Sequence, residues 1–172
     1  AMKTATGTNP GWNYTNIYRL EIAYNTTYFN GGSSQFFQRY ENMIELRLQP
    51  NSATWDANKQ MLAFWNCYKL ETIHNLDTFT FKDGTLGGAF QNCRSLTNIT
   101  IGVSPDVKKT QDSTFNGCTA LQSLNFKEAF PNLTTIGSTV FSGCANLKYL
   151  SIPASVTTFG STSFQNFTGL TF

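Results

Sequence analysis

Residues 136–153 read IGSTVFSGCANLKYLSIP, and the pattern of this stretch recurs along most of the chain. Counted from Phe141, it has cysteine at +3, leucine at +6, leucine or isoleucine at +9 and an apolar residue at +11. Full or partial copies begin at anchor positions 11, 37, 64, 90, 115, 141 and 164. Steps of 23 to 27 residues between these anchors predict a repeat architecture of about seven turns.

One such repeat cannot bury its own apolar face, but stacked repeats bury it because like residues then lie about 4.8 Å apart. Residues +8 to +12 alternate between apolar and polar, which predicts a short strand of a parallel sheet. The stretch before each phenylalanine is rich in turn formers. We therefore expect a solenoid with a short parallel β-sheet on its concave face, and irregular turns and short helices on its convex face. The inward residues of the sheet should include Leu46, Leu48, Ile73, Ile99, Ile101, Leu124, Phe126, Leu150 and Ile152.

Two inserts interrupt the regular pattern. Residues 52–62 could hold a short helix that is capped near Ser52. Residues 77–85 alternate and then reach Asp83-Gly84, which predicts an additional strand followed by a turn.

The repeated phrase resembles the BspA-like leucine-rich repeats, also described from Treponema surface antigens. Their hallmark is Ile-Gly-x-x-x-Phe-x-x-Cys-x-x-Leu-x-x-Ile-x-Ile-Pro, which residues 136–153 match almost letter for letter. The likeness is clear over 64–172 and degenerate over 11–50. We therefore expect one leucine-rich-repeat solenoid domain over 1–172, with degenerate repeats or a cap over 1–50 and regular repeats over 51–172.

The resemblance also implies a function. Proteins of this kind are typically secreted or surface-exposed proteins of bacteria, and of some parasitic protists, that act in adhesion or ligand binding. The motif itself defines no catalytic residue. We therefore expect a binding or adhesion module at the cell surface or secreted, and not an enzyme.

Composition argues against two classes of partner. The 172 residues are 40% hydrophobic and only 13% charged, and the net charge of +2 includes no basic run longer than Lys108-Lys109. Nucleic acid is therefore not expected as a partner. No stretch approaches the roughly 18–20 apolar residues of a membrane span, so a spanning segment is not expected either.

The four cysteines occupy the same slot of four successive repeats: Cys67, Cys93, Cys118 and Cys144. A zinc site would need ligands paired at short spacing, which the chain lacks. Neighbouring turns could bring two cysteines within disulfide range, so disulfides stay open as an alternative. Other repeats fill this slot with Tyr14, Tyr40 and Phe167, which favours a buried ladder of free thiols.

Catalytic and cofactor signatures are weak throughout. His74 is the only histidine, which excludes sites with several histidines and makes a hydrolytic triad improbable. The glutamates are scattered, without the pairing that glycoside hydrolysis needs. Glycine pairs at 31–32 and 87–88 lack a phosphate-binding continuation. We expect no metal and no cofactor.

The outward residues of the predicted strands, at +8 and +10, are the functional candidates. In the first two repeats Arg19 should lie beside Glu45, and Glu21 beside Arg47. Cross-strand pairs of this kind stabilise a sheet by roughly a few tenths of a kcal/mol each, so they are expected to be structural. The later rows are mainly neutral and suit hydrogen bonding to a protein or glycan, although a merely solvated face is the alternative. The candidate ligand-binding residues are His74, Asn98, Thr100, Ser123, Asn125, Tyr149 and Ser151.

Two rival functions remain open. A glycan ligand would be favoured if Trp55, Tyr68 and Tyr149 gathered in one shallow groove. An intracellular interaction scaffold would account for unpaired cysteines, since disulfides are rare in reducing compartments.

The last repeat begins at Phe164 and reaches Phe172 before its +9 and +11 residues. A solenoid needs its final apolar layer covered. We expect either that the native protein continues with further repeats or that two copies associate end to end.

Overall fold

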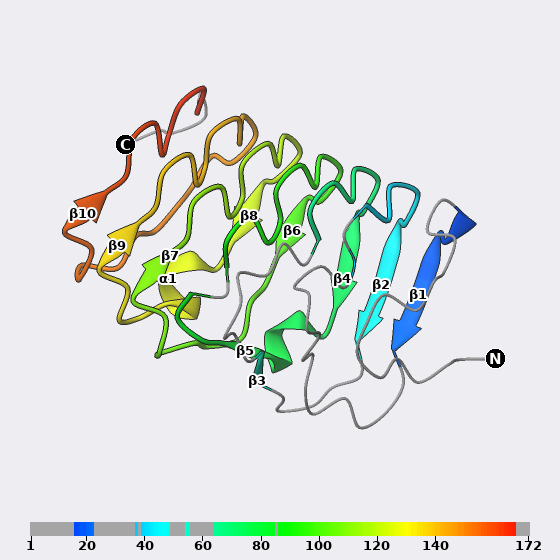
Figure 1. Ribbon diagram of the computed structural model, residues 1–172, viewed down its shortest axis with the longest axis horizontal. Helices are drawn as coiled ribbons and strands as arrows, with labels where there is room; N and C mark the ends of the chain where they lie inside the picture. Colours follow the sequence, from blue (N-terminus) through cyan, green and yellow to red (C-terminus); the bar gives the residue numbers. More distant parts are fainter. Residues whose placement is uncertain are drawn as a thin grey trace.

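The computed structural model describes residues 16–22, 37, 39–48, 54–55, 64–84 and 86–167. Within them the chain winds in successive turns that stack along one axis (Figure 1). Residues one repeat apart therefore lie side by side, as the repeat spacing predicts. The expected parallel β-solenoid is confirmed; the last residues of the final repeat and the anchor at residue 11 lie outside the described residues.

The first row of strands follows the predicted +8 to +11 positions. It contains β1 (Arg19–Ile22), β2 (Glu45–Leu48), β4 (Thr72–His74), β6 (Asn98–Ile99) and β8 (Ser123–Leu124). β1, β2 and β4 form one parallel sheet, in which Leu20, Leu46 and Ile73 are in register. β6 and β8 form a second one, with Ile99 opposite Leu124.

A second row of strands was not predicted as a whole. It contains β3 (Thr54–Trp55), β5 (Thr80–Phe81), β7 (Lys109–Thr110), β9 (Thr135–Ile136) and β10 (Thr158–Phe159). These strands also pair in parallel: β3 pairs with β5, and β9 pairs with β7 on one side and β10 on the other. Two residues are too few to show an alternating pattern. Only the strand at β5 was predicted, because the sequence around it alternates from residue 77, and the turn expected after it is present at Asp83-Gly84.

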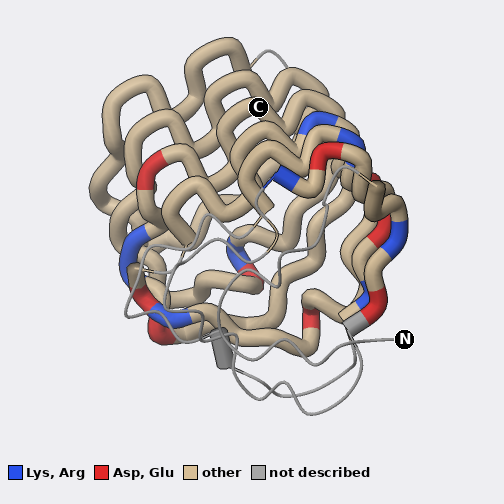
Figure 2. Tube along the Cα trace, turned by 45° about the vertical axis from the view of Figure 1, so that its right-hand side comes forward, with Lys and Arg blue, Asp and Glu red and all other residues tan. Residues whose placement is uncertain are grey.

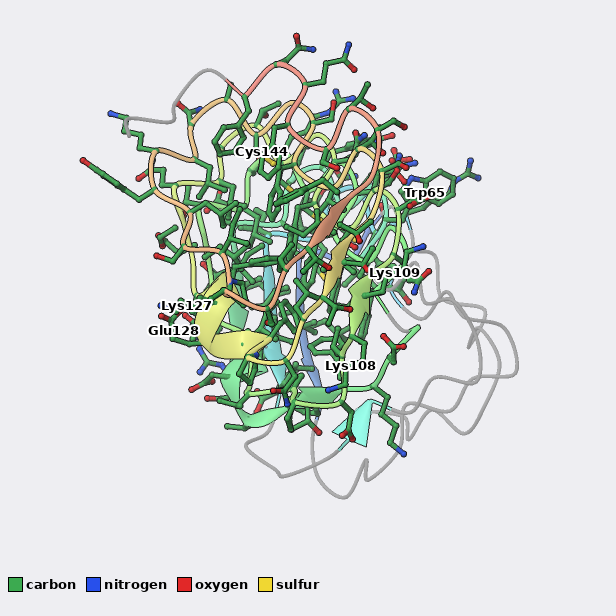
Figure 3. All side chains as sticks on the ribbon, turned by 90° about the vertical axis from the view of Figure 1, so that its left-hand side faces the viewer. Trp65, Lys108, Lys109, Lys127, Glu128 and Cys144 are labelled. Atoms are coloured by element: carbon green, nitrogen blue, oxygen red, sulfur yellow. The ribbon has the colours of Figure 1, made fainter. Side chains whose placement is uncertain are left out.

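The helices are short and lie between the two rows. They are the 3₁₀ turn η2 (Leu76–Thr78) and α1 (Phe126–Ala129). Viewed end-on, α1, which contains Lys127 and Glu128, lies at the lower left, and Lys109 of β7 lies on the opposite side (Figure 3). The predicted helix over 52–62 is wrong at Thr54–Trp55, which form β3, and its other residues lie outside the described ones.

The core is a column of phenylalanine rings. Successive rings stack face to face with centroid separations of 5.3 Å for Phe37–Phe64, Phe64–Phe90 and Phe90–Phe115, 5.6 Å for Phe115–Phe141 and 5.5 Å for Phe141–Phe164. Rings that overlap in this way exclude water along the whole axis and gain more than their area burial alone. The predicted in-register stacking of the phenylalanines is confirmed.

The predicted inward residues also pack in this core. Leu46, Leu48, Ile99 and Ile101 are buried, and Phe126 is buried at the start of α1 and not in a strand. Four others are partly buried against the core: Ile73, Leu124, Leu150 and Ile152.

The backbone explains why the repeat favours glycine at two positions, +2 and the second residue of the Ile-Gly pair. The residue at +2 has positive φ in every described repeat, as Asn66 (61°), Gly117 (74°) and Gly143 (77°) illustrate, and Asn and Gly adopt this region at least cost. The glycine of the Ile-Gly pair lies against the preceding turn, since a Cβ on Gly137 would stand 2.6 Å from the carbonyl oxygen of Thr110. The motif therefore fixes both the corner of each turn and the close approach of consecutive turns.

Candidate functional site

We call the outward +8 and +10 residues of successive turns the first-strand face, to which the first row of strands contributes down to β8. It comprises Arg19, Glu21, Glu45, Arg47, Thr72, His74, Asn98, Thr100, Ser123, Tyr149 and Ser151. Tyr149 and Ser151 occupy the same positions of the next turn, where the predicted strand is not formed. Parallel register places the residues of one repeat beside those of the next, and the apolar side chains between them point into the core. The strand period therefore separates a packed inner surface from a polar outer one.

A charged cluster around Glu45 occupies the first three strands of this face. The Nε atom of Arg19 lies 3.3 Å from Oε2 of Glu45, and Nη2 of Arg47 lies 3.0 Å from Oε1. Nε2 of His74 lies 2.7 Å from the same Oε1. The hydrogen bond with His74, reinforced by Arg47, lowers the pKa of the Glu45 carboxyl. Each of the three strands thus contributes a cationic or hydrogen-bonding group to one carboxylate.

The register confirms the predicted checkerboard, with Arg19 opposite Glu45 and Glu21 opposite Arg47. The bond between His74 and Glu45 was not predicted. It joins position +10 of one repeat to position +8 of the preceding one, a diagonal contact within reach of long side chains. His74 is half-buried in this cluster instead of standing alone on the surface.

Asn98 and Ser123 pair across β6 and β8. The Ser123 hydroxyl donates to Oδ1 of Asn98 at 2.6 Å, and the Asn98 amide donates to the Thr97 hydroxyl at 3.1 Å. Both side chains remain exposed, so their other hydrogen-bonding capacity faces solvent.

Asn125 departs from its expected position on the strand face. It precedes α1, and its side chain accepts a hydrogen bond from the amide of Ile101 at 2.9 Å and donates to the carbonyl of the same residue at 2.8 Å. Ile101 follows β6 without itself forming a strand. Asn125 therefore bridges two turns at the backbone, and its amide is largely committed to this structural contact.

Thr100, Tyr149 and Ser151 are exposed, and among the described residues their side chains have no hydrogen-bond or ionic partner. Tyr149 is the most exposed of the large hydrophobic side chains, at 74%. It does not gather with the other two aromatics considered for a glycan groove. Trp55 belongs to β3 of the second row, and Tyr68 is half-buried below Arg94, whose guanidinium carbon lies 4.9 Å from the ring centroid.

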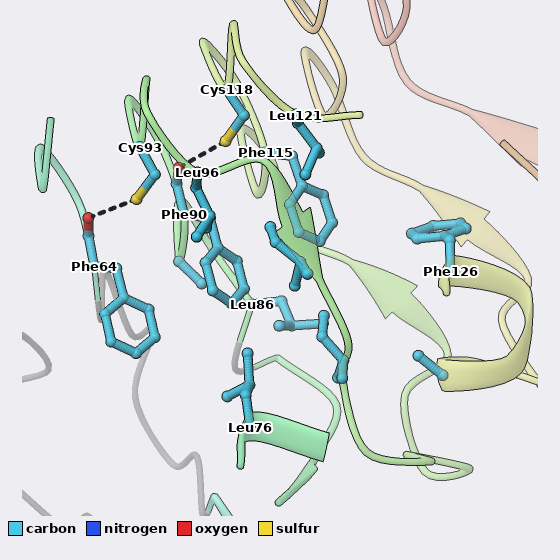
Figure 4. Packing of buried hydrophobic residues seen from close by; sticks show 14 of the residues in the cluster. Phe64, Leu76, Leu86, Phe90, Cys93, Leu96, Phe115, Cys118, Leu121 and Phe126 are labelled. Atoms are coloured by element: carbon cyan, nitrogen blue, oxygen red, sulfur yellow. Dashed lines mark hydrogen bonds between the residues drawn. The ribbon is translucent and has the colours of Figure 1, made fainter. Parts of the chain in front are cut away.

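The cysteines form the predicted ladder inside the coil. Each thiol donates to the carbonyl of the phenylalanine in the preceding repeat, for example Cys93 to Phe64 at 3.2 Å and Cys118 to Phe90 at 3.1 Å (Figure 4). All four are free and buried, so no disulfide joins them. Burial raises the pKa of Cys67 and Cys144 to about 12, and raises that of Cys93 and Cys118 well above the ordinary thiol value.

The described residues contain no cluster of three or more His, Cys, Asp or Glu side chains that could hold a metal ion. Along the described part of the chain, charged residues are separated by long uncharged stretches (Figure 2). In the same part of the chain no helix has the length and apolar character needed to cross a membrane.

Residues 34–171 match the family model of the BspA type leucine rich repeat region, in six copies. The chain belongs to this family. The BspA-type copies cover the six anchors from Phe37 to Phe164, which are the six stacked phenylalanines of the core. A comparison with curated proteins found no match.

Several solved bacterial structures share the fold. A leucine-rich cell surface protein from Faecalibacterium prausnitzii is 21% identical, with a TM-score of 0.54 over 99% of this chain and 55% of that one. A leucine-rich repeat protein from Eubacterium ventriosum is 20% identical, with a TM-score of 0.55 over 77% of this chain and 36% of that one. The leucine-rich repeat protein of T. pallidum is 17% identical, with a TM-score of 0.53 over 90% of this chain and 78% of that one. This BspA-type chain therefore spans only 36% of the E. ventriosum protein and 55% of the F. prausnitzii protein.

Proposed function

We propose that this BspA-type domain is a non-catalytic binding module that recognises a protein through its first-strand face. The observation that carries the proposal is the array of outward polar side chains at equivalent positions of successive turns, in register within β1-β2-β4 and within β6-β8, over a continuous apolar core. Such an array presents many groups at fixed positions, so a ligand meets a surface that is already organised. His74, Asn98, Thr100, Ser123, Tyr149 and Ser151 are its candidate contacts, and Asn125 contributes by holding the turn beside them.

We further propose that the domain works at the cell surface or in secreted form. The family resemblance supports this, as does the description of the F. prausnitzii structure as a cell surface protein. The four free thiols favour the rival reading of an intracellular scaffold, since disulfides are rare in reducing compartments. Their burial weakens that argument, because a buried thiol with a raised pKa has little thiolate to be oxidised.

The test is binding of the purified chain to an array of extracellular proteins. A double variant, Asn98→Arg with Ser123→Arg, places two bulky charges at the centre of the first-strand face. The matched control, Thr157→Arg with Ser161→Arg, places the same charges at exposed positions near β10. We expect the first variant to lose array partners that the control retains. Equal retention by both folded variants would contradict the proposal.

A further inference from the structure

The first-strand face divides into two halves of different chemistry. In the N-terminal half, on β1, β2 and β4, Glu45 is surrounded by Arg19, Arg47 and His74 at 2.7 to 3.3 Å. Glu21 lies in register with Arg47 and also has an interaction partner. The charges of this half therefore neutralise one another, and a ligand would have to break existing bonds to use them.

The C-terminal half, from β6 to residue 151, is different. Its face residues carry no charge: Asn98, Thr100, Ser123, Tyr149 and Ser151. The residues directly before the +8 positions are Thr97, Gln122 and Lys148, of which only Lys148 is charged. Among the described residues, the side chains of Thr100, Gln122, Tyr149 and Ser151 have no polar partner, and all four are exposed. A ligand can bind these groups without displacing an internal bond.

We infer that the ligand site is this neutral C-terminal half, with Tyr149 as its anchor, and that it takes an uncharged, hydrogen-bonding segment of a protein. The inference rests on the proposed function of the same face and assigns its location and ligand chemistry. A tyrosine exposed to 74% offers a large rigid contact area with a polar tip, the type of residue that dominates protein interfaces. The surrounding hydroxyl and amide groups complement peptide N–H and C=O groups.

The distribution of exposed aromatic rings favours a protein ligand over a glycan. Tyr149 is the one exposed ring among the described residues of the C-terminal half of the face. Tyr18 lies at the opposite end, Trp55 belongs to the second strand row, and Tyr68 is covered by Arg94. A stacking platform of several rings is therefore missing from the described part of the face. The pairing around Glu45 bears on charge instead: its cationic groups are already bonded, which disfavours an acidic partner.

The probe is a phage-displayed library of random linear peptides, selected on the immobilised chain. Synthetic copies of the enriched peptides are then measured against four folded variants. Tyr149→Ala removes the anchor, and Tyr18→Ala removes another exposed tyrosine, 53% exposed, from the first described repeat. Arg47→Gln breaks the charged cluster, and the Asn98→Arg, Ser123→Arg double variant blocks the whole face.

We expect enriched peptides with few charged residues, whose affinity falls at least about tenfold for Tyr149→Ala and less than about twofold for Tyr18→Ala and Arg47→Gln. Their affinity should also change less than about twofold between roughly 0.05 and 0.5 M NaCl, since no exposed ion pair is formed. Acidic peptides that depend on Arg47 and on salt would overturn the inference and leave the proposed function standing. Neutral oligosaccharides that bind through Tyr149 on a glycan array while no peptide does would overturn both the inference and the assignment of a protein ligand, although the face would remain the binding site. Peptides that bind the double variant as tightly as the parent chain would contradict the proposed function itself.

Discussion

Single buried rings determine the stability of this fold. Phe115 stacks on Phe90 at 5.3 Å and on Phe141 at 5.6 Å, and it is fully buried. Phe115→Ala would remove both contacts and leave a cavity in the column, so the free energy of unfolding should fall by about 3–5 kcal/mol. Urea denaturation measures this loss. Tyr149→Ala, an exposed control, should stay within about 0.5 kcal/mol of the parent, and a similar loss for both variants would refute the role of the column.

Backbone contacts make glycine necessary at one position and optional at another. A Cβ on Gly137 would lie 2.6 Å from the Thr110 carbonyl oxygen, and backbone cannot easily give way. Gly137→Ala should therefore cost about 1–3 kcal/mol, as overpacking does. Gly143 has a φ of 77° with only ordinary contacts around its Cβ, and three other repeats place Asn in the same slot, as Asn66, Asn92 and Asn166. Gly143→Asn should thus be nearly neutral in the same urea experiment. A larger loss of stability for Gly143→Asn than for Gly137→Ala would show that the close approach of Gly137 to Thr110 is not the cause.

At the scale of the element, the cluster on β1, β2 and β4 links strand pairing to pH. The pKa of Glu45 is lowered in the folded chain from its ordinary 4.5, so its bonds contribute fully above that pH. The contribution is lost as pH falls through the lowered folded value. The stability difference between the parent chain and Glu45→Gln should therefore shrink when urea denaturation is repeated at progressively lower pH below 4.5.

Glu71→Gln, an exposed substitution outside the cluster, is the control for this pH series. A difference between parent and Glu45→Gln that stays constant from neutral to strongly acidic pH would show that the bonds to Glu45 do not stabilise the sheet.

The elements also show how far sequence reasoning reaches. A repeat period fixes which residues stack, so the phenylalanine column, the cysteine ladder and the strands that begin near +8 were predictable. Strands of two residues, such as β7 and β9, carry no alternation, so the second row could be recognised only once the turns were closed. Asn125 was assigned to the first-strand face by its +10 position. The chain instead enters α1 at Phe126, and the Asn125 side chain bonds to the backbone of Ile101. The diagonal bond of His74 to Glu45 depends on side-chain reach, which spacing along the chain does not encode.

At the scale of the whole molecule, each turn contacts mainly the turns before and after it. The stability of such a stack is close to a sum of repeat and neighbour terms, so its ends should open more readily than its middle. The four cysteines can report this difference between ends and middle, because they occupy the same slot in four successive repeats and each thiol bonds to the repeat before it.

Thiol labelling therefore reports where the solenoid opens. With pKa values of about 12 for Cys67 and Cys144, and raised values for Cys93 and Cys118, the native thiols carry almost no thiolate near neutral pH and must be exposed before they react. Maleimide labelling followed by peptide mass spectrometry should find Cys67 and Cys144 modified first and Cys93 and Cys118 last. In denaturant without reductant all four should label at once. Equal native rates for the four would mean that the stack opens as one cooperative unit, and fewer than four reactive thiols in denaturant would mean that disulfides form after all.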